Sequence, residues 1–393
     1  MPATMQSITA ILKERYEDRM NKQIDDEAVA LRRITRTSDG IETNIGGKYT
    51  VFPIHTRRNQ GIGARLESEV LPPAGQQGTA VGRIRLSYLY GTMELSGQAF
   101  ELADTNPKAF ISAVDLETNG LKSDLAKDLN RQVYGDGTGK IATFTSTTAV
   151  NTTQYLQDGM QVDLYSSAGT LKNADVRITG WNDSTKAVTF ATSVTAAVGD
   201  YITRTGSKDR EWPGLAKIIS DTGTLYDIDP AVERTWKASV DTDSNPRAIS
   251  EARMITHYNK IRKNGQAPTL ILTNPGVWSS YWALLSQQRQ FVNTTEFTGG
   301  FKGLAFATEG GEIPVVQDFD APNGKMFFIN EKDLKVYREH DWKWMSRDGN
   351  MFKLKTGASG HYDAYFATMY QYSTLGIHRR NSHGVIDNLI ELT

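Results

Sequence analysis

The longest regular pattern of apolar and polar positions along the chain lies between Asn106 and Gly135. Its apolar residues recur at spacings of three, four or seven, which places them on one face of a helix. They are Phe110, Val114, Leu121, Leu125, Leu129 and Val133. Thr105 or Asn106 can cap this helix, Pro107 suits its first turn, and Gly135 ends it. About 28 residues at ~1.5 Å each give a rod of roughly 42 Å, long enough to be the spine on which a sheet packs.

A second helical pattern covers residues 7–36. Ser7 can cap it, and apolar residues from Ile8 to Ile34 form a stripe on an otherwise charged helix. An apolar stripe on a terminal arm has to be covered, either by its own domain or by a neighbouring chain.

Between Gly46 and Gly97 the pattern changes to two strand-like runs, KYTVFPIHT and VGRIRLSYLYGTMELSG, on either side of a long tip, RRNQGIGARLESEVLPPAGQQG. The runs predict the two arms of an extended hairpin. Its tip has too few apolar residues to offset the entropy of ordering it. We therefore expect the tip to be ordered on a partner.

The middle of the chain has two different patterns of apolar and polar residues. Residues 155–209 hold short alternating runs between Gly, Asn, Asp and Ser, which predicts a small antiparallel barrel or meander inserted into the chain. A helix over 246–263, a strand over 269–273, a helix over 274–291 and a strand at 313–316 then predict a compact α/β layer. From Lys325 the chain is rich in strands, which we expect to supply the sheet under the spine helix.

Composition narrows the class of protein. The 393 residues carry 44 Lys and Arg against 45 Asp and Glu. The net charge is therefore close to zero and does not indicate a protein whose surface coats nucleic acid. The absence of cysteine excludes disulfides, thiolate metal sites and cysteine catalysis, and favours synthesis in the cytosol. No run of about 18 apolar residues and no signal-peptide pattern is present, so no membrane partner is expected.

Charge is uneven along the chain. The hairpin is basic, with Lys48, Arg57, Arg58, Arg65, Arg83 and Arg85 against Glu67, Glu69 and Glu94. Residues 101–135 are mildly acidic, with Glu101, Asp104, Asp115, Glu117, Asp124 and Asp128 against Lys108, Lys122, Lys127 and Arg131. This asymmetry predicts that the hairpin of one subunit meets the spine of the next. The expected contact residues are Arg57, Arg58, Arg65 and Leu66 on the loop, and Asp115, Glu117 and Asp124 on the spine.

Candidate chemistry is weak. The run from Gly135 to Lys140 fails the phosphate-loop pattern, because the glycine spacing is short and Ile141 stands where a hydroxyl should hold magnesium. His378 and His383 lie five residues apart and would point to opposite faces of a strand, so no metal is expected. Trp278, Tyr281, Trp282 and Leu285 could form a stacking platform, but their helical spacing favours core, as does the pair Trp342 and Trp344. No catalytic residue and no cofactor is predicted.

The order of these parts resembles a major capsid protein of tailed bacteriophages, of the Hong Kong 97 type. RRNQGIGAR followed by LPPAG looks like the extension loop of that family, and AFISAVDLETNGLKSDLAKDLNRQVYGDGTG looks like its spine. LILTNPGVWSSYWALL resembles the axial domain and TLGIHRRNSHGVIDNL the closing strand of the peripheral domain. The resemblance covers all but about residues 148–212, which look like the β insertions of some members.

The resemblance implies an α+β fold with five parts. They are an N-terminal arm (1–45), an extension loop (46–97), a peripheral domain with the spine (98–147 and 325–393), an inserted β module (148–212) and an axial α/β domain (213–324). It also implies pentamers and hexamers that form an icosahedral head around double-stranded DNA, bound without sequence specificity on the inner face. Because only about 45 residues precede the hairpin, we expect a separate scaffolding protein, with a portal and sometimes a decoration protein. Assembly would occur in the host cytoplasm, and the final location is the virion.

Two alternatives remain open from the sequence. An encapsulin-type nanocompartment shell has the same fold but encloses protein cargo, and a soluble hydrolase with a β binding module would be small and would show turnover.

Some relatives join a loop lysine to a neighbour's asparagine, but residues 57–78 contain no lysine and Lys48 lies at the base of the loop. An uncrosslinked shell is therefore predicted. The inserted module is expected on the outside of the shell, with its ends Thr148 and Trp212 close together.

Overall fold

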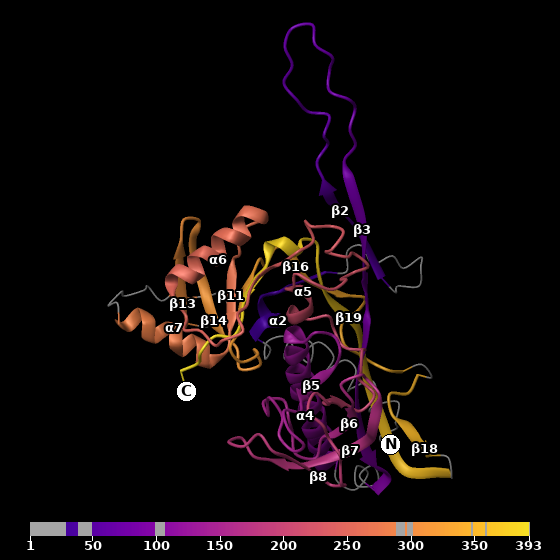
Figure 1. Cartoon of the computed structure of the whole chain (residues 1–393). Coiled ribbons are helices and arrows are strands. Elements are labelled where there is room, and N and C mark those ends of the chain that lie inside the picture. Colours follow the sequence, from indigo (N-terminus) through magenta and orange to yellow (C-terminus); the bar gives the residue numbers. More distant parts are fainter. Residues whose placement is uncertain are drawn as a thin grey trace.

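The computed structural model describes residues 29–37, 49–98, 107–287, 295–296, 302–346, 349–357 and 360–392. They form one long helix, a six-stranded and a seven-stranded sheet, a five-stranded module and a two-stranded ribbon. The ribbon projects far from the rest of the molecule (Figure 1). The mixed α+β class predicted from the sequence is confirmed.

The spine is helix α4 (Pro107–Tyr134), whose 28 residues coincide with the predicted rod. Val114, Leu129 and Val133 of its apolar stripe are buried. The middle of the stripe lies over strand β4 (Ser87–Ser96), where a side chain on Gly91 would come within 2.9 Å of Leu125 and 3.0 Å of Leu121. The helix can approach the strand this closely because Gly91 has no side chain.

The six-stranded sheet is built around β19 (Gly360–Ile377), a strand of 18 residues. One edge of β19 pairs antiparallel with β4. The other edge pairs in turn with β16 (Leu334–Arg338), β17 (Lys343–Trp344) and β18 (Lys353–Gly357). Strand β19, near the carboxyl end of the chain, therefore lies in the same sheet as the strand on which α4 packs.

The ribbon consists of β2 (Tyr49–Arg57) and β3 (Gly78–Arg85), paired antiparallel. Phe52 and Ile84 anchor its base in the main core beside Trp236. Phe52 stands opposite Gly82, where a side chain would lie within 2.5 Å of its ring, so only glycine fits.

The second arm of the hairpin was expected to run to Gly97, and this is wrong in detail. The chain leaves the ribbon at Leu86, and β4 pairs with β19 instead of β2. The reason is the alternation within β4, because Gly91, Met93 and Leu95 are buried on the side that faces the spine while their neighbours are exposed.

The helix expected over residues 7–36 ends earlier than predicted. Helix α2 covers Val29–Arg33, and Thr35–Thr37 forms β1, which pairs parallel with β16. Two threonines favour the extended strand, and the edge of β16 supplies its hydrogen bonds. Leu31 and Ile34 of the predicted stripe are buried, and residues 7–28 lie outside the described part of the chain.

The inserted module is a sheet of five strands in the order β5-β9-β6-β7-β8. The strands are β5 (Lys140–Thr143), β6 (Gln161–Tyr165), β7 (Leu171–Trp181), β8 (Val188–Phe190) and β9 (Tyr201–Arg204). The amide of Val188 donates to the carbonyl of Thr148 at 3.0 Å, which closes β8 back toward β5 in a barrel-like way. The module has a hydrophobic core of its own, which includes Phe144, Leu164, Ile178 and Ile202.

The predicted limits of the module, 148 and 212, need correction. Lys140–Thr143 belongs to the module because it pairs with β9, so Thr148 lies inside it. The chain enters and leaves where the amide of Asp209 donates to the carbonyl of Thr138 at 3.0 Å. Adjacent ends are what insertion into a loop requires.

The seven-stranded sheet has the order β10-β20-β15-β11-β14-β13-β12. Its strands are β10 (Ser239–Asp241), β11 (Leu270–Thr273), β12 (Thr295–Glu296), β13 (Lys302–Thr308), β14 (Gly311–Gln317), β15 (Met326–Ile329) and β20 (Gly384–Ile386). Ile271 and Phe328 point toward α6 (Glu251–Asn264) and α7 (Pro275–Gln287), whereas Leu270 and Phe327 join the core shared with the spine. Both faces of this sheet are therefore covered.

The sheet crosses the domain boundary expected at residue 325. Strands β15 and β20 were expected with the peripheral strands, but they pair with β11 and β10. Their runs MFFI and GVI are apolar throughout and buried on both faces, so the sequence carries no alternation that would assign them to a sheet. Helix α6 also begins later than predicted, at Glu251, and is capped by Ser250, whose hydroxyl accepts from the amide of Arg253.

Candidate subunit-contact surfaces

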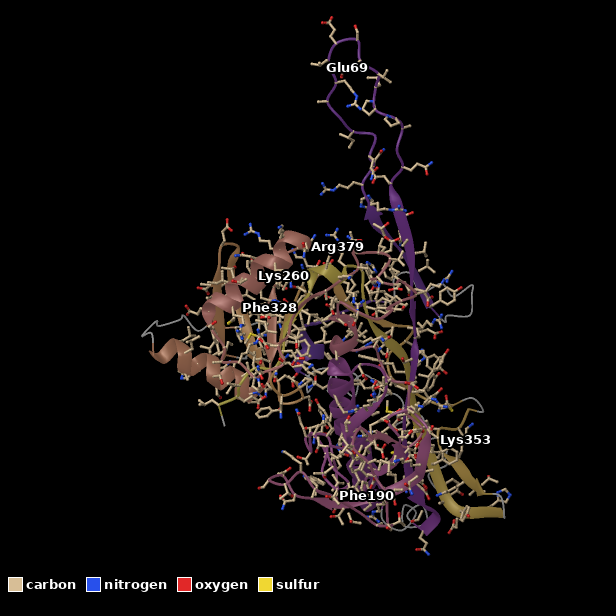
Figure 2. The ribbon with its side chains drawn as sticks, viewed as in Figure 1. Glu69, Phe190, Lys260, Phe328, Lys353 and Arg379 are labelled. Atoms are coloured by element: carbon tan, nitrogen blue, oxygen red, sulfur yellow. The ribbon has the colours of Figure 1, made fainter. Side chains whose placement is uncertain are left out.

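The tip of the ribbon, residues 58–77, holds the most exposed apolar side chains near one another. Ile62, Leu66, Val70 and Leu71 have 83%, 76%, 89% and 78% of their surface exposed. Figure 2 shows the tip, marked by Glu69, at the end of the ribbon that lies farthest from the body. Burying one such side chain stabilises by ~1.5–3 kcal/mol, so four of them together favour contact with another surface.

The predicted loop residues lie on this exposed segment or directly before it. Arg57 ends β2, and Arg58, Arg65 and Leu66 follow it, all exposed. Among the described residues neither Arg57 nor Arg58 makes an ion pair. Arg65 differs, because its Nε donates to the carbonyl of Val70 at 3.0 Å and its Nη1 to that of Ala64 at 2.9 Å. Arg65 thus holds the turn of the tip as well as carrying charge.

The predicted spine residues lie elsewhere in the same subunit. Glu117 and Asp124 are exposed on α4, two turns apart, and the side chain of Asp115 lies outside the described part of the structure. The ribbon points away from α4, so one subunit does not bring the arginines and these carboxylates together (Figure 1). Any contact between them has to join two copies.

Asp124 lines a groove of about 1370 Å³ that the sequence did not predict. One wall is β4, from Ser87 to Thr92, with Leu86 before it, and the opposite wall is α4, from Leu121 to Gln132. The module contributes Met160 and Arg204, and Asp227 lies at the end next to the ribbon. The alternation that continues through β4 was the only sequence signal for this groove.

Four charged residues join the spine to the module at the inner end of the groove. Arg131 contacts Glu211 at 2.5 Å and Asp128 at 3.1 Å, and Arg204 contacts Asp128 at 3.1 Å. Burial opposes ionisation of Asp128, but Arg131 and Arg204 outweigh it and lower its pKa. For Glu211 the effect of burial is larger than that of Arg131, so the pKa of Glu211 is raised. The module is therefore attached to α4 by a buried ionic cluster.

A second polar cluster attaches the spine to the end of β14 in the seven-stranded sheet. Asn130 Nδ2 donates to Asp318 at 3.0 Å and to Asp320 at 2.6 Å, and the hydroxyl of Tyr134 donates to Asp318 at 2.9 Å. Burial raises the pKa of Asp318 although these groups donate to it. The hydroxyl of Tyr155 donates to the carbonyl of Asp320 at 2.7 Å, so the module takes part as well.

The structure places the other candidates as follows. His383 is buried, His378 is exposed with its Nε2 2.6 Å from the hydroxyl of Tyr337, and no cluster of three or more potential metal ligands occurs in the described ranges. The segment from Gly135 to Lys140 is the link between α4 and β5, in which Asp136 accepts from the amide of Thr138. None of the helices among the described residues is long and apolar enough to cross a membrane.

The aromatic candidates divide between core and surface. Tyr281 and Leu285 are buried, as are Trp342 and Trp344. Trp282 is 51% exposed and stacks on Trp278 at 5.8 Å, so its expected place in the core is wrong. The reason is its position on α7, where Trp282 lies beside the stripe of buried residues that includes Tyr281 and Leu285.

Comparison with known proteins gives one family and several structures. The family model for the SU10 major capsid protein matches residues 3–390. Among curated proteins none matches the chain. The capsid asymmetric unit of cyanophage A-1(L) is 13% identical, with a TM-score of 0.54, and the match covers 95% of this chain and 93% of that chain. This likeness shows a shared fold.

Two further structures are less similar. A chain of Mycobacterium phage Bobi is 9% identical with a TM-score of 0.44, covering 98% of this chain and 99% of that one. The holo-SrpI encapsulin complex from Synechococcus elongatus PCC 7942 is 10% identical with a TM-score of 0.45, covering 92% and 87%.

Proposed function

The chain belongs to the SU10 major capsid protein family, and from this premise we propose that it assembles as pentamers and hexamers into a phage head that encloses double-stranded DNA. Its role as a structural protein of an icosahedral capsid follows from the family, and the resemblance to phage capsid proteins of the Hong Kong 97 type is confirmed. The number of subunits in each capsomer and the nature of the contents belong to the proposal.

The observation that carries the proposal is the ribbon. Four apolar side chains at its tip are each at least 76% exposed, and the side-chain hydrogen bonds of residues 59–70 among the described residues stay within the tip. Figure 2 shows the tip at the far end of the ribbon. In an assembly of identical chains, each copy can bury the apolar side chains of its tip on the surface of the next copy. Every copy then makes the same contact twice, once with its tip and once with its surface. Closed rings and shells result when the rotation between copies closes.

The charge pattern supports the same arrangement. We propose that Arg57, Arg58 and Leu66 of one subunit lie across the spine of the next, near Glu117 and Asp124, with Asp115 on the same helix. A scaffolding protein, a portal and a decoration protein would be partners of the assembled head, with assembly in the host cytoplasm and no catalysis by this chain. DNA would contact the inner face without sequence specificity, consistent with a net charge of −1.

Sedimentation of the purified full chain at several concentrations, combined with negative-stain microscopy, tests the proposal. We expect capsomers or closed shells, alone or with a coexpressed scaffolding protein. A species that stays at 43.6 kDa at high concentration, with residues 58–77 protected from protease, would contradict it. Shells that contain protein cargo and no DNA after expression during infection would favour a nanocompartment instead.

A further inference from the structure

Asp318 and Asp320 form a carboxylate pair directly after strand β14. One nitrogen atom, Nδ2 of Asn130 on the spine, donates to Asp318 at 3.0 Å and to Asp320 at 2.6 Å, so the two carboxylates share a single neutral donor. Asp318 is 2% exposed. In the described part of the chain, neither carboxylate has an ion pair with a lysine, an arginine or a histidine. Buried carboxylates without a cation are expected to bind a proton instead.

The carboxylate pair lies where four parts of the subunit meet. The hydroxyl of Tyr134 on the spine donates to Asp318 at 2.9 Å, and the amide of Ala30 in α2 also donates to Asp318. From the inserted module, the hydroxyl of Tyr155 donates to the carbonyl of Asp320 at 2.7 Å. Burial raises the pKa of both tyrosines, so their hydroxyls stay protonated and can donate. The charge of the pair therefore affects contacts of the spine, the module and α2 with the end of β14.

The charged groups nearest to the pair do not neutralise it. Arg131 and Lys127 on the spine favour ionisation of Asp320. Arg131, however, forms its ion pairs within the other cluster, where it contacts Glu211, and Lys127 is exposed to solvent. Burial raises the pKa of Asp318 and of Asp320, and the charge of Asp318 adds to the effect on Asp320.

We propose that Asp318 and Asp320 together hold one proton, and that this proton makes the junction of the spine, the module, α2 and β14 sensitive to pH. Two carboxylates that share one donor repel each other when both are ionised, and a single bound proton removes this repulsion. The pair titrates as a unit, so the proton belongs to neither residue alone. The junction lies within one subunit and does not depend on the proposed assembly into shells.

The direction of the pH dependence follows from the raised pKa of the pair. An unfolded aspartate has a pKa of ~3.9, so above that pH the folded pair holds a proton that the unfolded chain has released. The stability that this proton contributes is complete below about pH 3.9 and is lost as pH rises through the pKa of the folded pair. The junction therefore weakens as pH rises.

Infrared spectroscopy of the full chain, kept as unassembled subunits, tests for the proton directly. A protonated carboxyl group has a C=O stretching band, which exposed carboxyl groups lose as pH rises past ~4. The parent should keep such a band at pH 5, and Asp318→Asn and Asp320→Asn should each weaken it. Asp158→Asn makes the same change at an exposed position of the module and should leave the band unchanged. Glu211 contributes equally in every variant, since burial raises its pKa as well.

Urea unfolding of the same variants at pH 4.5 and pH 8 measures the effect on stability. Relative to the parent, the folding equilibrium constant of Asp320→Asn should rise at least about threefold between the two pH values, the effect of a pKa raised by about one unit. Asp158→Asn should keep the parent's dependence on pH. Because the parent's own band is followed without any substitution, the infrared titration tests the pair even where a variant does not fold.

Two results would overturn the inference. In the first, the parent has no carboxyl band above the background of exposed groups at pH 5, or both Asn variants keep the parental band and the parental pH dependence. In the second, CaCl2 raises the thermal midpoint of the parent but not that of Asp320→Asn, and the band is absent. A cation would then neutralise the pair in place of the proton.

Discussion

At the scale of single residues, two buried histidines make the stability of the fold depend on pH. His257 on α6 lies 5.1 Å from the ring of Phe328, and His383 precedes β20. Burial lowers the pKa of His257 to about 4 and that of His383 to about 3. The amide of Asn330 donates to Nδ1 of His383 at 3.3 Å, a bond that only the neutral ring can accept.

This burial predicts a loss of stability in mild acid. The pKa of an unfolded histidine is ~6.5, so below that pH the unfolded chain takes up a proton that the folded chain does not bind. The free energy of unfolding therefore falls from about pH 6.5 down to about pH 3, by ~2 kcal/mol per histidine at pH 5. His383→Asn, whose Oδ1 can still accept from Asn330, should flatten this fall in urea unfolding at pH 7.5 and pH 5.

The exposed His361 supplies the control for this test. His361→Asn should leave the difference between the two urea midpoints at the parent's value. A His383→Asn variant with the full parental pH dependence would show that the acid sensitivity comes from other groups.

Arg131 is the second residue whose environment predicts a large effect. Its side chain is 7% exposed and contacts Glu211, which is 6% exposed, at 2.5 Å. Arg131→Met would leave Glu211 buried beside Asp128 without its cation, and breaking a buried pair in this way costs ~3–5 kcal/mol. We expect a clear drop in the thermal midpoint of the unassembled subunit.

An exposed ion pair provides the comparison. Arg262 contacts Glu309 at 2.5 Å, but both side chains are close to half exposed or more. Arg262→Met should shift the midpoint very little, since exposed pairs contribute little. Equal shifts for the two variants would mean that the Arg131 cluster is not a buried one in solution.

At the scale of elements, the sequence predicted those whose period is long and unambiguous. The stripe from Val114 to Val133 repeats over about five turns, and α4 has the predicted limits. The alternation in KYTVFPIHT likewise predicted β2. Both signals are local, because each pattern lies entirely within the residues of the element that it predicts.

The elements that were misplaced depend on partners far away in the sequence. β15 is apolar on both faces, so nothing in MFFI says that it pairs with β11 rather than with the strands that follow it. β1 forms because Thr35–Thr37 meets β16, about 300 residues later. The groove beside β4 was not predicted for the same reason, since its walls come from three separate parts of the chain.

The inserted module leads to a prediction about deletion. Because Asp209 hydrogen-bonds to Thr138 and the module has its own core, residues 139–208 should be replaceable by a short Gly/Ser linker. The rest should stay soluble and form capsomers, with a lower thermal midpoint because Arg204 no longer contacts Asp128. Sedimentation and thermal unfolding measure both results.

Removing residues 148–212 instead should fail. That deletion keeps β5 but removes its partner β9, and it also takes Glu211 from beside Arg131. We expect insoluble protein from the longer cut and soluble protein from the cut at 139–208. If neither variant is soluble, the module is part of the folding core of the subunit.

At the scale of the whole molecule, the exposed ribbon favours contact between copies over an isolated subunit. Residues 57–78 contain no lysine, so the segment that reaches a neighbour has no amine for an isopeptide bond. We expect shells held by noncovalent contacts alone. Boiling mature particles in detergent should release a single band near 43.6 kDa, and a ladder of multimers that survives boiling would show that a lysine elsewhere is used.

The last prediction concerns charge between copies. Arg57 and Arg58 are exposed and make no ion pair within the described part of one subunit, and the exposed carboxylates of Glu117 and Asp124 lie on α4. An exposed pair contributes only ~0–1 kcal/mol, but every copy repeats it around a ring. At ~1 M salt, where the Debye length is about 3 Å, assembled shells should loosen before their subunits unfold.

Reversing both arginines, Arg57→Glu with Arg58→Glu, should block assembly and leave the thermal transition of the subunit nearly unchanged, because neither side chain is packed. Asp124→Lys should restore assembly in part. Arg234→Glu with Lys237→Glu makes the same change of net charge at exposed positions outside the tip of the ribbon and should assemble like the parent. Sedimentation measures all three. If the double reversal at 57 and 58 assembles normally, the loop is held by Ile62, Leu66, Val70 and Leu71, and charge only guides the encounter between copies.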